Sequence, residues 1–292
     1  MVSEKLSSDY KFFYTKNVPS LFIKVFSNSY DFLDRLRKLT SGLQFNSKEH
    51  VADVEYRVYL RRNGYGKHLI KKNGSIVYKA NDRNDLLINL LVCFQNDFIQ
   101  TFDDHLILHS ALVIRNGIAL VLPGPRKSGK STLVISLLKH GFKYYSDDIT
   151  AINLKSLRAT GFPRAIMIRD NTLSLFPSLK PEITCYGYKL YNGHKSKKIH
   201  LGIPSKKVLA PLNKSFPISS IIFPKYSSNG NTFISDIKNS SAVLNLMGCT
   251  LNQNRFVDSG FKTAASIVRN IKCYSLQIKD LSKACEIING LI

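Results

Sequence analysis

The sequence predicts an α/β fold in which a mixed sheet follows a small β-rich N-terminal region. Two apolar runs, 106–115 and 118–122, are continuous, as expected for strands that are buried on both faces. A glycine-rich loop follows, and then a stretch over 130–140 that predicts a helix ending at Gly141. The apolar segment 142–146 predicts the next strand. We expect this strand to run parallel to 118–122, because a right-handed crossover joins strands on either side of a helix.

Residues 1–100 are expected to form the β-rich accessory region, and residues 101–292 the second domain. Short, partly alternating segments in the accessory region are separated by Asn-Gly pairs, which are strong signals for two-residue hairpin turns. A buried helix is predicted after them, with Asp85 at its start as the residue that can cap the first turn. The predicted strands cover 54–62, 67–72 and 75–79, the turns are Asn63-Gly64 and Asn73-Gly74, and the helix covers 85–94.

The chain carries a net charge of +22, from 42 basic and 20 acidic side chains. Such a charge favours anionic partners such as nucleotides, acidic peptides or nucleic acid, although lysine can also be the ordinary solvated residue of this chain. The five cysteines form no C-x-x-C pair, which argues against a zinc site or a disulfide framework. A cytoplasmic protein without a membrane span is expected, because no apolar run reaches about 18 residues and the N-terminus lacks a signal peptide.

Residues 124–131, Gly-Pro-Arg-Lys-Ser-Gly-Lys-Ser, match the Walker A pattern G-x-x-x-x-G-K-[ST] at every position. Glycines let the backbone curl until successive N–H groups point at phosphate oxygens, and the N-terminus of the next helix adds a favourable partial charge. An apolar strand before the pattern and a helix after it favour this P-loop over a chance glycine turn. Lys130 is expected to reach the β- and γ-phosphates of ATP, and Ser131 to bind Mg²⁺. The residues expected to bind the nucleotide are Gly124, Arg126, Lys127, Ser128, Gly129, Lys130, Ser131 and Thr132.

A histidine is expected beside this loop. If Asn116-Gly117 is a two-residue turn, the hairpin register pairs Arg115 with Ile118 and His109 with Gly124. The imidazole can then donate to a transferring phosphoryl group or help to hold its metal ion. A histidine in an apolar strand can instead be a hydrogen-bonded core residue, and both interpretations stay open.

A pair of aspartates, Asp147 and Asp148, ends the strand that follows the P-loop helix. The carboxyl edge of a parallel sheet would place the pair near the phosphates. Phosphoryl transfer uses one carboxylate near the metal ion and one base near the attacking hydroxyl. Either Asp147 or Asp148 can take either role, and an ordinary strand-ending turn is the alternative.

In order and spacing, three blocks of the chain resemble the HPr kinase/phosphorylase superfamily, whose core is shared by the phosphoenolpyruvate carboxykinases. That family has a histidine before its P-loop and paired aspartates after the P-loop helix. Three later segments are similar to the HPr kinase-related kinase A group, so that the likeness covers about residues 100–292. The three blocks are 109–111, 124–131 and 145–148, and the later segments are 161–166, 222–226 and the tail from Phe261.

The resemblance implies a P-loop kinase core with His109 and Lys130 in the active site, Asp148 as the proton acceptor and Ser131 as a metal ligand. With Asp148 as the base, Asp147 is expected nearer the metal ion. One departure matters. The HPr enzymes carry a glutamate-containing signature after the aspartate pair, which supplies a second metal ligand, and no equivalent glutamate is evident over 164–170. Two arginines of this region, Arg164 and Arg169, are either a phosphate clamp or surface residues.

The remaining C-terminal part is less regular until a helix, a strand and a helix over 261–270, 273–278 and 281–289. Before them, the lysine-rich stretch 189–207, with His194 and His200, is expected to be a loop that either faces the substrate or is merely solvated.

Together these features predict an ATP-dependent, Mg²⁺-dependent kinase that, by the resemblance, phosphorylates a serine of a protein or peptide. The positive charge favours an acidic acceptor. Two alternatives stay open: a P-loop kinase that acts on a small molecule, and a nucleotide-gated protein that binds nucleic acid through its basic surface. A homo-oligomer is compatible with all three.

Overall fold

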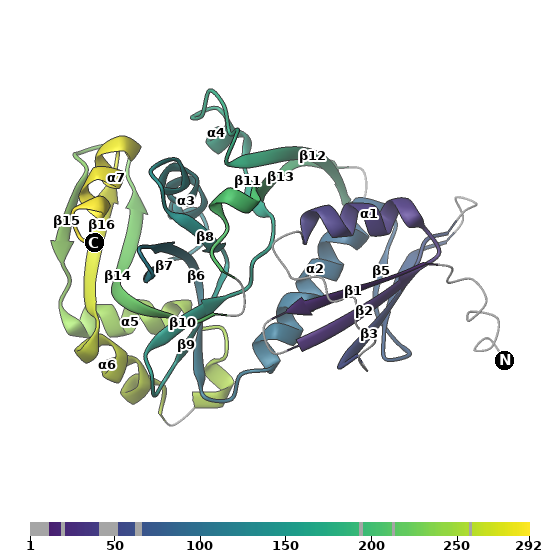
Figure 1. Cartoon of the computed structure of the whole chain (residues 1–292), viewed down its shortest axis with the longest axis horizontal. Helices are drawn as coiled ribbons and strands as arrows, with labels where there is room; N and C mark the ends of the chain where they lie inside the picture. Colours follow the sequence, from purple (N-terminus) through teal and green to yellow (C-terminus); the bar gives the residue numbers. More distant parts are fainter. Residues whose placement is uncertain are drawn as a thin grey trace.

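The structure is a computed structural model, and it describes residues 12–18, 21–40, 52–61, 66–192, 195–211, 214–256 and 259–292. The described part is a mixed α/β structure with seven α-helices and three sheets (Figure 1). This confirms the α/β class that the sequence predicts. None of the helices in these ranges is long and apolar enough to cross a membrane.

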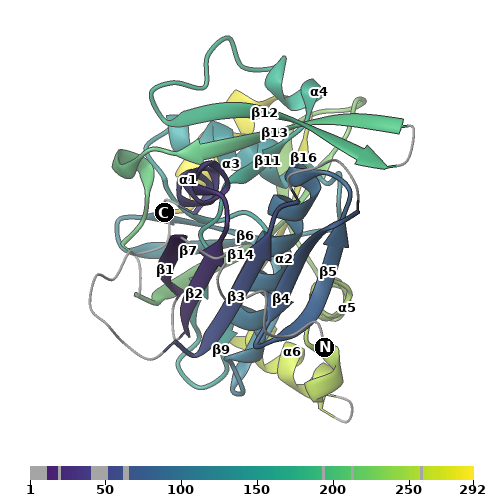
Figure 2. The same cartoon turned by 90° about the vertical axis from the view of Figure 1, so that its right-hand side faces the viewer.

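The N-terminal sheet has five strands in the order β1-β2-β3-β4-β5, and helices α1 and α2 cover one of its faces (Figure 2). Alternate residues of β3 are buried, as expected for a sheet with one covered face. The three predicted strands and the Asn73-Gly74 turn are confirmed, while Asn63-Gly64 lies outside the described residues. The elements are β1 (Phe12–Val18), β2 (Leu21–Ser27), α1 (Tyr30–Leu39), β3 (Val54–Tyr59), β4 (His68–Lys72), β5 (Ser75–Ala80) and α2 (Arg83–Gln100).

The bounds predicted for α2 are wrong at both ends. Asp82 caps the helix in place of Asp85, because its carboxylate accepts hydrogen bonds from the backbone N–H groups of Asn84 (2.8 Å) and Asp85 (3.0 Å). The helix then continues to Gln100, because its buried face extends through Phe98.

The second sheet is arranged around β6, which lies between β9 and β7. Strands β7, β14 and β16 are parallel neighbours on one side of it. Helices α3 and α7 pack on one face and α5 and α6 on the other, so Leu120 and Leu122 of β7 enter one core while Ala119 and Val121 enter the other. The elements are β6 (His105–Arg115), β7 (Ile118–Pro123), α3 (Lys130–Lys139), β8 (Lys143–Ser146), β9 (Ile149–Asn153), β10 (Arg158–Gly161), β14 (Phe216–Tyr226), β15 (Phe233–Asp236), α5 (Asn239–Cys249), α6 (Gly260–Asn270), β16 (Lys272–Ile278) and α7 (Leu281–Asn289). The predicted C-terminal helix, strand and helix are thereby confirmed.

The basic stretch 189–207 is mainly a strand, so its prediction as a loop is wrong. It forms β13 (Lys195–Pro204), which pairs with β12 (Ile183–Asn192) and with β11 (Ile166–Ile168) in a third, three-stranded sheet. The reason is a period of two that the lysines obscure: Ile199 and Leu201 alternate with polar residues and are buried in the N-terminal core. His194 lies outside the described residues.

The hairpin register predicted for β6 and β7 is confirmed. Arg115 pairs with Ile118 across the turn, and Ser110 pairs with Pro123 at the other end. Asn116 and Gly117 have φ values of 52° and 77°, which is the left-handed pair that a tight two-residue turn requires. Beyond the last ladder pair, the backbone N–H of Gly124 donates to the carbonyl oxygen of His109 over 3.4 Å. The histidine and the start of the glycine-rich loop are therefore held together by backbone geometry.

Strand β8 runs parallel to β7, as predicted, but β6 separates the two. Both β7 and β8 pair antiparallel with β6, on its opposite sides. Beyond β8 the chain continues directly into β9, which takes over the pairing with the first half of β6. The aspartate pair thus lies in the short connection between two strands that pair with successive segments of the same edge of β6.

The apolar core of the N-terminal region continues across residue 100, where the sequence predicts a domain boundary. Phe98 of α2 packs on Phe162, with ring centroids 5.4 Å apart, and both side chains are fully buried. A backbone contact just before β11 adds to this, since the N–H of Ala165 donates to the carbonyl of Leu39 over 3.2 Å. The boundary itself stays a prediction.

We predict that Gly117→Ala lowers the free energy of unfolding by about 1 kcal/mol, because an added Cβ disfavours the φ of 77°. A matched control is Gly248→Ala in α5, where an added Cβ meets no atom within 4 Å. There alanine should stabilise the helix by about 0.5–1 kcal/mol. Urea unfolding measures both changes, and a shift of the same sign for the two variants would contradict the role of the turn.

Candidate active site

The glycine-rich loop leaves β7 at Pro123 and enters α3 at Lys130. Lys127 and Gly129 both have left-handed backbone angles, φ 72° and 96°, so the chain curls tightly before the helix. Gly129 is the N-cap of α3 and supplies no side chain to accept from the first-turn N–H groups. These N–H groups and the helix dipole are suited to bind an anion.

The loop is packed from beneath by its own residues and by β14. A Cβ at Gly124 would lie 2.8 Å from the Ser128 hydroxyl oxygen, so only glycine leaves room for this serine. That hydroxyl is buried and makes no hydrogen bond within the described residues. The carbonyl oxygen of Ser128 accepts from the backbone N–H of Tyr226 over 3.1 Å. An unpaired buried hydroxyl inside the loop fits a phosphate oxygen as its partner.

Lys130 is almost fully buried, with 6% of the residue exposed. Its ammonium group donates to the carbonyl oxygens of Gly124 and of Pro125, the latter over 3.1 Å. Burial lowers the pKa of Lys130 to about 8, against the opposing effect of Cys249 and Asp147. The amine is therefore folded over the loop, where a phosphate would restore the stability of its charged form.

The aspartates differ sharply in exposure. Asp147 is 1% exposed, and its carboxylate accepts a hydrogen bond from the Tyr144 hydroxyl over 3.3 Å. Burial raises the pKa of Asp147, although Arg164 beside it acts in the opposite direction. Asp148 is 31% exposed and forms a close ion pair with Arg164. One carboxylate is thus embedded in the protein, and the other faces the solvent side of the site.

Arg164 joins the two aspartates. Its guanidinium contacts Asp148 directly and approaches Asp147 to 4.0 Å, while its backbone carbonyl accepts from the Tyr144 hydroxyl over 2.8 Å. Only 8% of the arginine side chain is exposed, so it is not a surface arginine. Whether it also clamps a phosphate stays a prediction.

Arg169 is exposed and precedes the short helix α4 (Asp170–Leu173). Its charge contributes to the lowered pKa of Lys130, so the two cations lie near one another. Helix α4 is tied to the first turn of α3 by a hydrogen bond of 2.9 Å between the Thr132 and Thr172 hydroxyls. The hydrogen bond holds α4, and with it the preceding Arg169, beside the start of α3. The role of Arg169 as a phosphate clamp stays a prediction.

His109 lies between the loop and the aspartates. Its Nε2 atom is 3.6 Å from Asp148 Oδ1, and a quarter of its side chain is exposed. Burial lowers the pKa of His109 to about 4, and the charges of Lys130, Arg126 and Arg164 act in the same direction. At neutral pH the ring is therefore uncharged and can donate from one nitrogen while accepting at the other.

Several residues of the site carry no signal in the sequence. The segment after α5 fills the edge of β6 that β7 leaves when it turns into the loop: the N–H of Leu251 donates to the Ile107 carbonyl over 2.8 Å, and the Asn252 side chain accepts from the Ile107 N–H over 3.0 Å. This brings Cys249 close to Lys130. Likewise, His200 of the basic stretch is not a free loop histidine, because it contacts Asp170 over 2.7 Å.

The oxygen donors predicted for Mg²⁺ are of the right chemistry. The described residues contain no group of three or more His, Cys, Asp or Glu side chains arranged for a metal. Mg²⁺ bound to phosphates needs only one or two protein ligands, and these are usually oxygens. A bound cation near Asp147 would also favour the charged form of this buried carboxylate, whose pKa is raised. Ser131 in the first turn of α3 and Asp147 therefore fit the ion.

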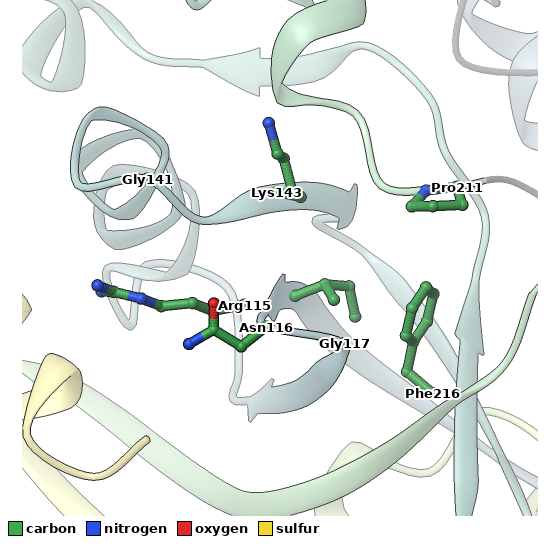
Figure 3. A pocket seen from close by; sticks show the side chains of 8 residues that line it. Arg115, Asn116, Gly117, Gly141, Lys143, Pro211 and Phe216 are labelled. Atoms are coloured by element: carbon green, nitrogen blue, oxygen red, sulfur yellow. The ribbon is translucent and has the colours of Figure 1, made fainter.

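A pocket of about 450 Å³ lies away from these residues, at the turn end of the β6–β7 hairpin (Figure 3). This position is at the opposite end of the hairpin from the glycine-rich loop, so the pocket is separate from the candidate active site. The two cations that line it already have partners: Arg115 donates to the Asn289 side chain, and Lys143 donates to the carbonyl of Lys207. It is lined by Ile114, Arg115, Asn116, Gly117, Gly141, Lys143, Pro211 and Phe216.

We predict that His109→Gln makes the stability of the protein less dependent on acid. The folded pKa of about 4 lies below the unfolded value of about 6.5, so between these values the unfolded chain binds more protons. Stability should fall as pH drops from 6.5 to 4, and less steeply in the variant. Urea unfolding at pH 7.5 and pH 5 tests this, and parallel losses in both proteins would contradict the lowered pKa.

Comparison with known proteins adds no family to this geometry. The chain matches no protein-family model, and no match was found among curated proteins. What the site can do is therefore a question of its own residues: a loop suited to phosphates, a buried lysine, and an arginine-bridged pair of aspartates beside a neutral histidine.

Proposed function

We propose that the chain is an ATP-dependent kinase of the HPr kinase type, which transfers the γ-phosphate to a serine hydroxyl of a protein or peptide. One observation carries the proposal. The hydrogen bond from Gly124 to the His109 carbonyl places the first residue of the phosphate-binding loop beside the group formed by His109, Asp148 and Arg164. A loop suited to bind the phosphates of a donor and a candidate base thus lie at one edge of the sheet.

In this proposal the loop N–H groups and Lys130 bind the phosphates, and Asp148 takes the proton of the acceptor hydroxyl. Exposure favours Asp148 for that role, because its carboxylate is 31% exposed to an incoming hydroxyl and that of Asp147 only 1%. The ion pair with Arg164 fixes the orientation of Asp148. Mg²⁺, when bound by Ser131 and Asp147, would offset the charge of the phosphates.

His109 completes the arrangement. The neutral ring stands within 3.6 Å of Asp148 and adds no charge of its own. It can donate a hydrogen bond to a transferring phosphoryl oxygen, and three nearby cations already attract that group electrostatically. The net charge of +22 favours an acidic protein or peptide as the acceptor.

We predict that Lys130→Ala loses at least 10-fold in affinity for MgATP and most phosphate transfer, because a charge partner of the phosphates is removed. Calorimetry measures the affinity, and labelled phosphate from γ-³²P-ATP, incubated with serine-containing acidic peptides, measures the transfer. The control is Lys139→Ala in the last turn of the same helix, whose amine pairs with Glu182 over 3.2 Å at the surface. Equal MgATP affinity in the parent and in Lys130→Ala would contradict the proposal.

A salt-sensitive gel shift with nucleic acid, without any turnover of MgATP, would instead support the nucleotide-gated binding protein. Phosphate appearing on a small hydroxyl compound and never on a peptide would support the small-molecule kinase.

We predict that Asp148→Asn binds MgATP almost as the parent does but transfers phosphate on the order of 100-fold more slowly, because the amide cannot accept the proton. Asp147→Asn should instead raise the Mg²⁺ concentration needed for half-maximal rate. Initial rates over a Mg²⁺ titration separate the two effects. An exchanged pattern would reverse the two roles, and full activity in both variants would reduce the pair to a structural turn.

A further inference from the structure

We infer that Tyr226 is the platform on which the base of the bound nucleotide stacks. The inference rests on the proposed function. It adds the place where the base, the end of the nucleotide opposite the γ-phosphate, is bound. Tyr226 ends β14, and 59% of it is exposed, although it is an aromatic residue in contact with the phosphate-binding loop. Its backbone N–H donates to the Ser128 carbonyl, and its Cβ lies 3.5 Å from the position that a Cβ would occupy at Gly129.

The direction of the nucleotide follows from the order of the strands. The groups proposed to act on the γ-phosphate, His109 and Asp148, belong to β6 and to the end of β8. Both are on one side of β7, and β14 is its neighbour on the other side. A nucleotide with its γ-phosphate toward β6 must extend away from β6 with its remaining atoms. Its base then leaves the loop on the β14 side, where Tyr226 stands.

The parallel strands explain why an open surface exists there. Strands β7, β14 and β16 are parallel, so their carboxyl ends share one edge of the sheet, which is where ligands of α/β sheets bind. Figure 1 shows β14 running beside β7 toward this edge, with β16 beyond it.

Tyr226 is also held rigidly, as a stacking platform must be. On one side its N–H is bonded to the loop; on the other, the N–H of the next residue, Ser227, donates to the Ile278 carbonyl over 2.9 Å. The turn that follows is anchored by the Thr232 hydroxyl, which accepts from the N–H groups of Lys279 (3.0 Å) and Asp280 (2.7 Å). An aromatic ring on a fixed backbone loses little freedom when a base stacks on it, and stacking tolerates any base because each has a π-face.

The experiment uses the absence of tryptophan from the chain, which makes an introduced tryptophan the sole reporter. In Tyr226→Trp, MgATP should quench the indole fluorescence by stacking, whereas magnesium tripolyphosphate, which has no base, should not. The matched control is Phe261→Trp on α6, where the replaced side chain is 61% exposed and MgATP should leave the emission unchanged.

Calorimetry on the parent and two further variants completes the test. Tyr226→Ala should weaken MgATP about 10-fold and leave magnesium tripolyphosphate unchanged, and Tyr226→Phe should bind both as the parent does. If the parent binds MgATP but Tyr226→Ala binds it equally well, the inference is overturned while the proposed function stands. If Tyr226→Ala instead raises only the KM of the acceptor peptide, the residue belongs to the acceptor site, and the inference is equally overturned. If the parent binds neither compound, both fail together.

Discussion

Everything in the candidate site depends on the backbone pairing of β6. The two-residue turn fixes its register with β7 and thereby brings His109 to the loop. On its other edge β6 pairs with β8 and then β9, so the aspartates in the connection between them come to the same place. Where β7 leaves the sheet, the segment at Thr250 takes up the vacated edge through a bridge to Leu108. A single strand thus sets the relative positions of residues separated by up to about 140 positions in the chain.

The second constraint is electrostatic. Charged groups are costly to bury unless they are paired, and the site satisfies this by placing Arg164 between the two carboxylates. Within the described ranges no carboxylate contacts Lys130 directly, and its ammonium group donates to loop carbonyls instead. The consequence for His109 is a neutral ring, because burial and cations both oppose its protonation. The two carboxylates are thus paired with Arg164, whereas the charge of Lys130 is left to interact with a bound anion.

The sequence was sufficient where short-range chemistry decides the structure. The Asn-Gly pairs predict the hairpin turns, the continuous apolar runs predict β6 and β7, and the glycine-rich pattern predicts the start of α3. The sequence was insufficient where contacts between distant segments determine the structure. Nothing adjacent in the sequence links Asn252 to Ile107 or Tyr226 to Ser128, since these contacts form only in the assembled sheet. Strand β13 is not evident in the sequence because its lysines hide the alternation. The helix α2 is predicted, but its start is wrong because Asp82 caps it in place of Asp85.

The shared core between the N-terminal helices and the second sheet has a consequence for how this chain can be handled and how it could have evolved. Phe98 and Phe162 pack against one another, with tilted rings, inside one apolar cluster that also contains Ile107, Ile149 and Leu201. A fragment beginning near residue 101 would present this surface to water, and exposed apolar patches of that kind favour aggregation. The N-terminal region covers the apolar cluster to which β6 and β9 contribute Ile107 and Ile149. Gene fusions, domain exchanges and shortened expression products would therefore have to include this region.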